Sequence, residues 1–426
     1  MIKKLLNYPL IKTSGIYTIT NIINKAIPFF LLPILTIFLT PTDYGLVSMF
    51  GVLIGFIGPF LGLNVHSAIN RRYFDYDKNF TQYISTAFYI LIASSSLVLI
   101  VIILFSDVVS EITALPEKYL LLVVIAAFGN SAIQITLSLW QVRERALNYG
   151  LFQIIQSALN VTLSIILVVG LDYGWLGRVS GQVIAISIFA VVGILIIVKR
   201  ENLKFSFNKV FAEDILKFGI PLIPHTLGMF LINMTDRIFI TNMISISETG
   251  IYTVGFQIGM IIGVLQDSFN KAWMPYLFKN LKLNSNLVKI KIIKITYGYF
   301  IVILLIALSL SLLAPFIVNV FIGDAFEGSI VYIMWISFGF AFNGMYKMVA
   351  GVIFYERKNK LLSIVTFITA ILNIVFNYIL IKLNGAVGAA QATALAFFVS
   401  FILTWILASR VHYMPWNIFK YRKEEN

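Results

Sequence analysis

Apolar runs of about 20 residues recur along this whole 426-residue chain, and they limit its fold more than any other feature. Each run can cross the ~30 Å hydrocarbon core of a bilayer as one α-helix. The chain is 59% hydrophobic and 12% charged, with a mean hydropathy of +0.90, which excludes an ordinary soluble domain. We therefore predict an all-α polytopic membrane protein with about 12 transmembrane helices. The predicted spans are residues 14–39, 44–65, 81–105, 119–140, 149–170, 175–198, 217–243, 248–270, 292–315, 329–353, 362–382 and 387–408.

The second half of the sequence repeats three short motifs of the first half, in the same order and at offsets of 205, 212 and 211 residues. Such regularity indicates an internal duplication, and a duplicated membrane bundle is typical of transporters. We expect two six-helix lobes, at residues 1–198 and 217–408, with a basic cytoplasmic linker at 199–216 and a basic tail at 409–426. The matched residues are Gly45 and Gly250, Glu144 and Glu356, and Gly174 and Gly385.

The net charge of +13 is distributed unevenly between the predicted loops. When alternate loops are assigned to opposite sides, with the N-terminus inside, most of the 32 lysines and arginines fall on one side. The positive-inside rule then predicts that both termini are cytoplasmic. Topology and contact with anionic lipid headgroups explain the basic loops, so we expect membrane lipids and no nucleic acid as partners.

Several classes of function lack the residues they need. The chain has no cysteine and three histidines, and no His/Asp/Glu cluster has the spacing of metal ligands. No phosphate-binding Gly-x-x-x-x-Gly-Lys-Ser/Thr loop occurs, and the predicted outer loops are too short to hold a catalytic site. We expect no catalytic residue, no metal and no cofactor, and thus no enzyme.

Polar residues inside the predicted spans require an explanation, because an ionised side chain at mid-bilayer costs roughly 2.5–3.5 kcal/mol. Lys25 lies near the middle of the first span and shares a helical face with Asn21. In the tenth span, Asn343 and Lys347 are four residues apart and also share a face. We expect both faces to line a polar cavity.

The seventh span carries Asn233, Asp236 and Arg237. Asn233 and Arg237 are four residues apart and share a face. Asp236 and Arg237 are adjacent and point in different directions, so we expect each to meet another helix or water rather than its neighbour. Arg237 is a further candidate cavity cation, and Asp236 is the candidate site for a coupling ion.

Two other charges have simpler explanations. Arg178 lies just inside the outer end of the sixth span, where it either extends to the membrane interface or contributes to substrate binding. Asp267 lies near the inner end of the eighth span, where we expect an ion pair with Lys271 one turn later.

The balance of these charges indicates the kind of substrate. The expected buried cations outnumber the buried acids, and no carboxylate lies deep in a span of the first half. A cationic drug or a coupling proton would require cavity carboxylates. A cationic cavity instead favours an anion, and a phosphate or diphosphate fits it best.

An ordered set of motifs resembles the polysaccharide flippase family. The set includes the acidic-Tyr-Gly segment around Gly45, a run of two arginines and two aromatics after the second span, and a Pro-rich entry to the second half. The chain resembles Wzx-type flippases for O-antigen or capsule repeat units, within the multidrug/oligosaccharidyl-lipid/polysaccharide (MOP) exporter superfamily. The matching segments are 41–46, 71–74, 217–224, 236–240, 250–252 and 385–390.

The resemblance implies a function in the bacterial inner (cytoplasmic) membrane. Members move undecaprenyl-diphosphate-linked oligosaccharides to the periplasmic leaflet by alternating access, for lipopolysaccharide or capsule synthesis. Lys25, Arg237 and Lys347 would correspond to the cationic cavity residues of the family, with Asn21, Asn233, Asn343 and Arg178 as weaker polar contacts. Polysaccharide polymerase and assembly proteins would be further partners. The two extra helices of some lipid-precursor flippases are absent.

The sequence leaves two alternative functions open. A proton- or sodium-coupled multidrug or metabolite antiporter of the same superfamily would carry acidic cavity residues. A polysaccharide polymerase or ligase would need a large external loop with catalytic Arg or His, and none is predicted.

Overall fold

The computed structural model describes residues 20, 23–24, 27, 29–75, 79–201, 203, 205–283 and 285–417, with the backbone alone for His225, Met229 and Asn359. These residues form helices and connecting loops, without any strand in the described ranges, which confirms the predicted all-α class. The chain packs as two compact units, Met1–Phe230 and Leu231–Asn426.

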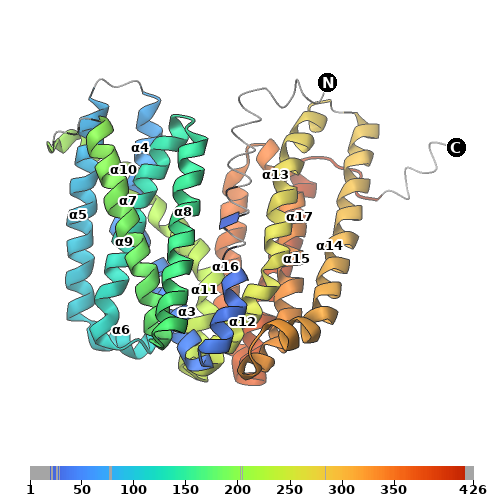
Figure 1. Ribbon diagram of the computed structural model, residues 1–426. Coiled ribbons are helices and arrows are strands. Elements are labelled where there is room, and N and C mark those ends of the chain that lie inside the picture. The colour runs from blue at the N-terminus through green and yellow to red at the C-terminus, as the bar shows by residue number, and fades with distance from the viewer. Residues whose placement is uncertain are drawn as a thin grey trace. The chain divides into compact units, whose positions relative to one another are not determined.

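The first unit consists of helices joined by short turns (Figure 1). Its longest helices alternate in direction, as expected of consecutive membrane spans. The described elements are α3 (Pro41–Gly62), α4 (Val65–Tyr73), α5 (Phe80–Leu104), α6 (Ser106–Thr113), η1 (Glu117–Tyr119), α7 (Leu120–Val142), α8 (Ala146–Ile165), η2 (Ile166–Gly170), α9 (Gly174–Glu201), α10 (Lys209–Gly219) and η3 (Ile220–Leu222).

The second unit begins within α11 (Ile223–Met243), since Phe230 belongs to the first unit and Leu231 to the second. Its remaining helices surround α15, which packs against α12, α13, α14 and α17. They are α12 (Ile246–Gly259), α13 (Ile261–Leu281), α14 (Asn286–Phe321), η4 (Asp324–Ser329), α15 (Ile330–Tyr355), α16 (Asn359–Asn384) and α17 (Val387–Val411).

Ten described helices are long and apolar enough to cross a membrane. The bent pair Lys209–Gly228 and Phe230–Met243 gives an eleventh when counted as one span. These helices match eleven of the predicted spans. The predicted first span, 14–39, lies mostly outside the described residues, and its end forms the short apolar helix Phe29–Phe38.

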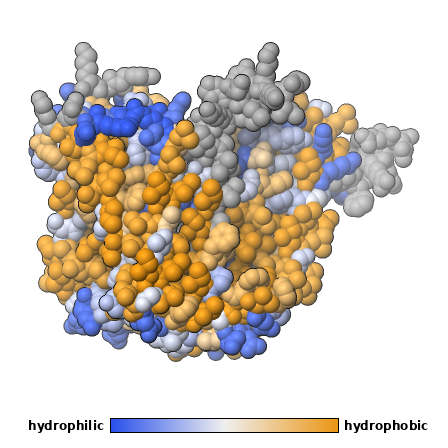
Figure 2. All heavy atoms as spheres, in the orientation of Figure 1, coloured by the Kyte–Doolittle hydropathy of each residue, from blue (hydrophilic) through white to orange (hydrophobic). Residues whose placement is uncertain are grey.

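The surface of each unit has the pattern of a membrane protein. Figure 2 shows apolar side chains over the middle of each unit and hydrophilic side chains towards its ends. Large apolar side chains such as Phe30, Leu312 and Leu383 are more than two-thirds exposed, at 77%, 73% and 71%. Lipid accounts for this exposure, because apolar surface towards hydrocarbon has no cost.

The predicted linker includes helix α10, which is fixed to the first unit. Asn208 caps it by accepting hydrogen bonds from the backbone N–H groups of Val210 and Phe211. Asp214 then accepts hydrogen bonds from Arg71 on α4, at 2.6 Å, and from the Tyr83 hydroxyl on α5, at 2.8 Å. These residues hold α10 against α4 and α5.

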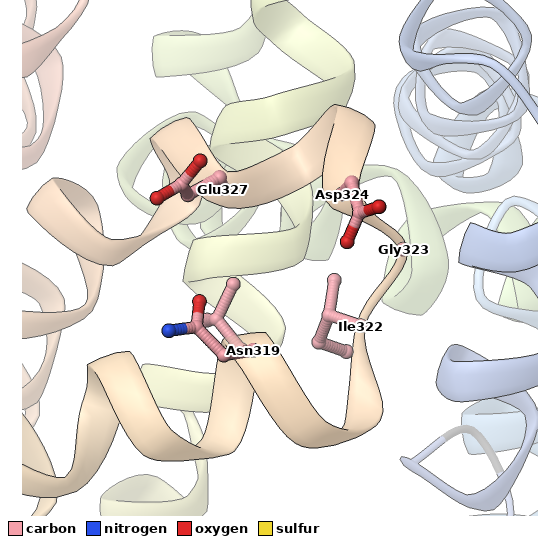
Figure 3. A pocket seen from close by; sticks show the side chains of 6 residues that line it. Asn319, Ile322, Gly323, Asp324 and Glu327 are labelled. Carbon is pink, nitrogen blue, oxygen red and sulfur yellow. The ribbon is translucent and has the colours of Figure 1, made fainter.

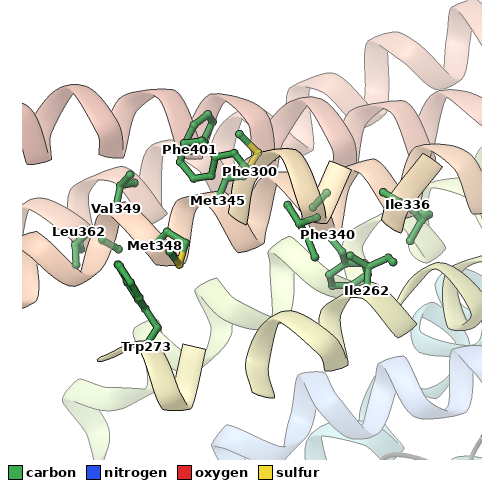
Figure 4. Close-up of a cluster of buried hydrophobic side chains, with 14 of the residues drawn as sticks. Ile262, Trp273, Phe300, Ile336, Phe340, Met345, Met348, Val349, Leu362 and Phe401 are labelled. Carbon is green, nitrogen blue, oxygen red and sulfur yellow. The ribbon is translucent and has the colours of Figure 1, made fainter. Parts of the chain in front are cut away.

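The core of the second unit is aromatic and aliphatic. Figure 4 shows Phe300, Phe340, Met345 and Phe401 among side chains from α13 to α17. Phe300 and Phe401 pack edge to face, with ring centroids 5.3 Å apart. This contact packs α14 against α17 within the unit.

The internal repeat is visible in how two helix pairs pack. A Cβ at Gly177 of α9 would lie 2.8 Å from the carbonyl oxygen of Leu167 in η2, which directly follows α8. In the second unit, a Cβ at Gly388 of α17 would lie 2.0 Å from the carbonyl oxygen of Leu380 on α16. Only glycine lets the two backbones approach so closely at these positions, as small residues do between membrane helices.

Candidate functional site

The two residues predicted in the first span, Lys25 and Asn21, lie outside the described residues. Asn24, one of the two described residues between them, makes contact with α8. Its side-chain Nδ2 donates to Gln153 Oε1 at 3.2 Å, and its side-chain Oδ1 accepts from Ser157 Oγ at 2.8 Å. Asn24 therefore supplies polar contacts to α8 in the first unit.

Helix α8 has a polar face that was not predicted from the sequence. Five of the polar side chains of α8 follow at spacings of four, four, three and four residues, which places them on one side of the helix. The spacing is visible in the sequence, but these residues are uncharged and therefore stand out less than ionised residues in a membrane span. The residues of this α8 polar face are Tyr149, Gln153, Ser157, Asn160 and Ser164.

Arg178 of α9 hydrogen-bonds to this face. Its Nη1 donates to Asn160 Oδ1 at 2.9 Å and to Ser164 Oγ at 3.0 Å. Both acceptors are neutral. The structure places the Arg178 side chain along α8, within the first unit.

Asp236 and Arg237 form a buried ion pair in the second unit, which corrects the expectation that they would not meet. They are 2% and 5% exposed, and Arg237 Nη1 lies 3.2 Å from Asp236 Oδ1. The long arginine side chain folds back along α11 and also donates to the carbonyl oxygen of Asn233 at 2.9 Å. Attraction between charges that are shielded from water outweighs the unfavourable direction of neighbouring side chains.

Aromatic rings of α12 complete the surroundings of this pair. The Tyr252 hydroxyl donates to Asp236 Oδ2. The guanidinium carbon of Arg237 lies 4.3 Å from the centroid of the Phe256 ring, a cation–π contact. As expected, both charged residues thus also meet a neighbouring helix.

Lys347 forms an ion pair with Asp267, with 2.5 Å between Nζ and Oδ1. One residue earlier on α13, Gln266 Nε2 donates to Asn343 Oδ1 at 3.0 Å. Asn343 and Lys347 thus share a face of α15, as predicted. The expected partner of Asp267 was Lys271 on the same helix. The structure shows a partner 80 residues away, which sequence spacing does not reveal.

These pairs change the expected balance of charge. The two predicted cations of the second unit each have a carboxylate partner of their own. Arg178, in contrast, has neutral acceptors. Among the predicted site residues that the structure describes, Arg178 is therefore the cation that has no carboxylate partner.

Helix α16 carries a second polar face that was missed. Thr369, Asn373 and Asn377 are four residues apart and at most 2% exposed. Asn377 Nδ2 donates to the carbonyl oxygen and the side-chain oxygen of Asn373, at 2.9 and 3.2 Å. Asn373 Nδ2 and Asn377 Oδ1 have no partner among the described residues. The even spacing could have revealed this face.

A pocket of about 270 Å³ lies in the second unit, where α14 ends and η4 begins. Figure 3 shows Asn319, Asp324 and Glu327 around it, and no predicted site residue lines it. Its two carboxylates would repel an anion, so we do not assign the transported anion to this pocket.

Two proteins of Haemophilus influenzae are similar to this chain. One, described as an uncharacterized membrane protein, is 29% identical over 366 residues, which is 83% of this chain and 86% of that protein. The other, Lsg locus putative protein 1, is 25% identical over 403 residues, which is 91% of this chain and 97% of that protein.

The fold is similar to those of solved transporters. An inward closed conformation of the lipid II flippase MurJ has a TM-score of 0.76 at 15% identity, with 94% of this chain and 87% of that chain covered. An inward-facing multidrug resistance MATE family transporter of the MOP superfamily has a TM-score of 0.66 at 16% identity, with 94% and 96% covered. These similarities confirm the predicted fold of the superfamily.

A family model described as polysaccharide biosynthesis protein matches residues 10–281, which is more than half of the chain. The match confirms the resemblance to polysaccharide flippases that the motifs indicated. Together with the fold, it identifies a multi-pass membrane transporter of polysaccharide biosynthesis. The chain belongs to the polysaccharide biosynthesis protein family.

Proposed function

We propose that this protein moves polyprenyl-diphosphate-linked oligosaccharide repeat units from the cytoplasmic to the periplasmic leaflet of a bacterial inner membrane. The repeat units would serve the synthesis of O-antigen or capsule, and both termini of the chain would be cytoplasmic. The observation that carries the proposal is the family match over residues 10–281 on a fold shared with a lipid II flippase. Membrane-embedded cations that suit a diphosphate support it.

In this proposal, Lys25, Arg237 and Lys347 bind the diphosphate during the transport cycle. Arg237 and Lys347 begin from ion pairs with Asp236 and Asp267. A diphosphate carries more negative charge than a carboxylate and therefore competes for the same cations. Asn21, Asn233 and Asn343 donate hydrogen bonds to the oligosaccharide.

Exchange of partners at Arg237 suggests how an ion gradient couples to transport. When a diphosphate binds Arg237, Asp236 loses its counter-charge while it remains buried. A buried carboxylate without a partner is unstable, so Asp236 then binds a proton or a sodium ion. Release of the diphosphate restores the Asp236–Arg237 pair and expels the ion. The lobes alternate between inward-open and outward-open states during this cycle.

Proteoliposomes provide the test. The purified protein is offered a fluorescent polyprenyl-diphosphate oligosaccharide, with a cationic dye in parallel vesicles. We expect movement of the lipid-linked sugar and its loss in Lys25→Ala. Arg200→Gln, at the exposed end of α9, is the matched control and should transport normally. Movement of the dye alone under a proton gradient would contradict the proposal and indicate a drug antiporter.

A further inference from the structure

Helix α8 presents opposite faces to two different environments. Leu147, Leu151 and Ile155 are 59%, 57% and 55% exposed and lie on one side of the helix. The α8 polar face lies on the other side and extends over about 22 Å, most of the ~30 Å hydrocarbon core. Polar groups that face hydrocarbon without partners are costly, so the apolar side faces lipid and the polar side faces away from it.

The α8 polar face is only partly used by the protein itself. Asn24 and Arg178 hydrogen-bond to four of its side chains. Gln153, Ser157 and Asn160 nevertheless remain half-buried, so part of each side chain is accessible. A row of hydroxyl and amide groups with remaining hydrogen-bonding capacity suits a sugar chain, whose hydroxyls both donate and accept.

Arg178 adds a positive charge at one end of this row. Its two hydrogen bonds to α8 both come from Nη1, whereas a guanidinium has five N–H donors. No ion pair joins Arg178 to a carboxylate among the described residues. The free edge of the guanidinium matches the two oxygens of a carboxylate.

The internal repeat shows that the fold does not require this arginine. Gly388 lies 211 residues after Gly177, and the same offset places Ala389 opposite Arg178. Ala389 is 0% exposed, so α16 and α17 pack closely without a cation at this position. A charged residue that its duplicate lacks, in a membrane span, indicates a ligand rather than a packing role.

We propose that the α8 polar face binds the sugar part of the translocated glycan and that Arg178 binds the carboxylate of an acidic sugar within it. This inference rests on the proposed function and specifies its substrate class. The hydroxyl and amide groups of α8 exchange hydrogen bonds with sugar hydroxyls, while Asn160 and Ser164 hold the guanidinium so that its free edge meets the carboxylate.

The test uses the full-length protein in proteoliposomes and two fluorescent polyprenyl-diphosphate trisaccharides. The two differ at one sugar, which is glucuronate in one and glucose in the other. We expect the wild type to transport the glucuronate glycan preferentially. Arg178→Gln should slow that glycan roughly tenfold to a hundredfold and the glucose glycan less than twofold, since a charge-assisted bidentate contact is lost. Arg200→Gln should preserve the preference.

The outcomes separate this inference from the proposed function. Equal slowing of both glycans by Arg178→Gln would overturn the inference, because it would indicate a role in folding or in binding the diphosphate or a lipid phosphate. Equal transport of both glycans by the wild type would also overturn it, while leaving the flippase intact. Movement of neither glycan by the wild type would reject both proposals.

A second variant guards against misfolding. Arg178→Lys keeps the charge but loses the planar pair of donors. We expect it to keep the preference for glucuronate at a severalfold lower ratio, and its folding is checked by gel filtration and thermal unfolding. An unchanged ratio in Arg178→Lys would contradict the bidentate contact.

Discussion

The α8–α9 pair of the first unit and the α16–α17 pair of the second have the same backbone packing and different polar chemistry. Gly177 and Gly388, which are related by the repeat offset of 211 residues, each permit a close approach between neighbouring backbones, and each pair carries a polar face. The face on α8 is half-buried and meets an arginine. The face on α16 is fully buried, and two of its amide atoms have no partner among the described residues. After duplication, therefore, the scaffold was kept while the polar side chains of the two pairs diverged.

The close approach at the two glycines gives the largest expected effects. Gly388→Val should abolish folding, because its Cβ would lie 2.0 Å from a carbonyl oxygen. Gly177→Ala, with a contact of 2.8 Å, should lower stability by about 1–3 kcal/mol. Thermal unfolding of the purified variants measures both.

Gly58→Ala is the control for these variants, because a Cβ there meets nothing within 4 Å. It should be neutral or stabilise α3 by up to ~1 kcal/mol. If Gly388→Val folded as well as Gly58→Ala, the two helix pairs would not share the packing described above.

Removal of one charge should have the next largest effect, and this effect should differ between the two units. Asp236→Asn should destabilise the protein by about 3–5 kcal/mol, because Arg237 then remains buried without a counter-charge. Arg178→Gln should have a smaller effect, since its partners are neutral. The Asp236→Asn/Arg237→Gln double variant should be less destabilised than the sum of the single changes, and thermal unfolding gives the coupling. Simple additivity would argue against the pair.

The α16 polar face should tolerate apolar replacement. Asn373→Leu together with Asn377→Leu should change stability by only ~1 kcal/mol, because the change removes atoms that have no described partner. Chemical unfolding of the variant in detergent measures this. A loss of several kcal/mol would show that the α16 face has binding partners comparable to those of α8.

The smallest effect is expected at the partly exposed pair. Lys347 and Asp267 have 27% and 38% exposed side chains, so their attraction is screened. Lys347→Gln should cost at most ~1 kcal/mol in thermal unfolding. A cost as large as that of Asp236→Asn would mean that exposure does not distinguish the two pairs.

The spans and the repeat could be predicted because they are properties of consecutive residues. Eleven predicted spans match described helices, and Gly388, whose Cβ would meet Leu380, lies three residues after the matched repeat position Gly385. The Lys347–Asp267 pair could not be predicted, since it depends on how α13 and α15 pack. Helical directions alone argue against the Asp236–Arg237 pair, because they leave out the reach of an arginine side chain. The spacing of polar residues on α8 and α16 could have predicted both polar faces, but these residues carry no charge to draw attention to them.

The two-sided character of α8 has a consequence for how an amphiphile could move. A helix about 10 Å across separates a surface wetted by lipid from one that offers hydrogen bonds. Our proposal would place the polyprenyl tail of the substrate on the lipid-facing side of α8 and its hydrated oligosaccharide on the polar side. Such a molecule need never enter a single medium completely. The barrier to crossing would then be set by the charged junction between tail and head, and only weakly by the length of the tail.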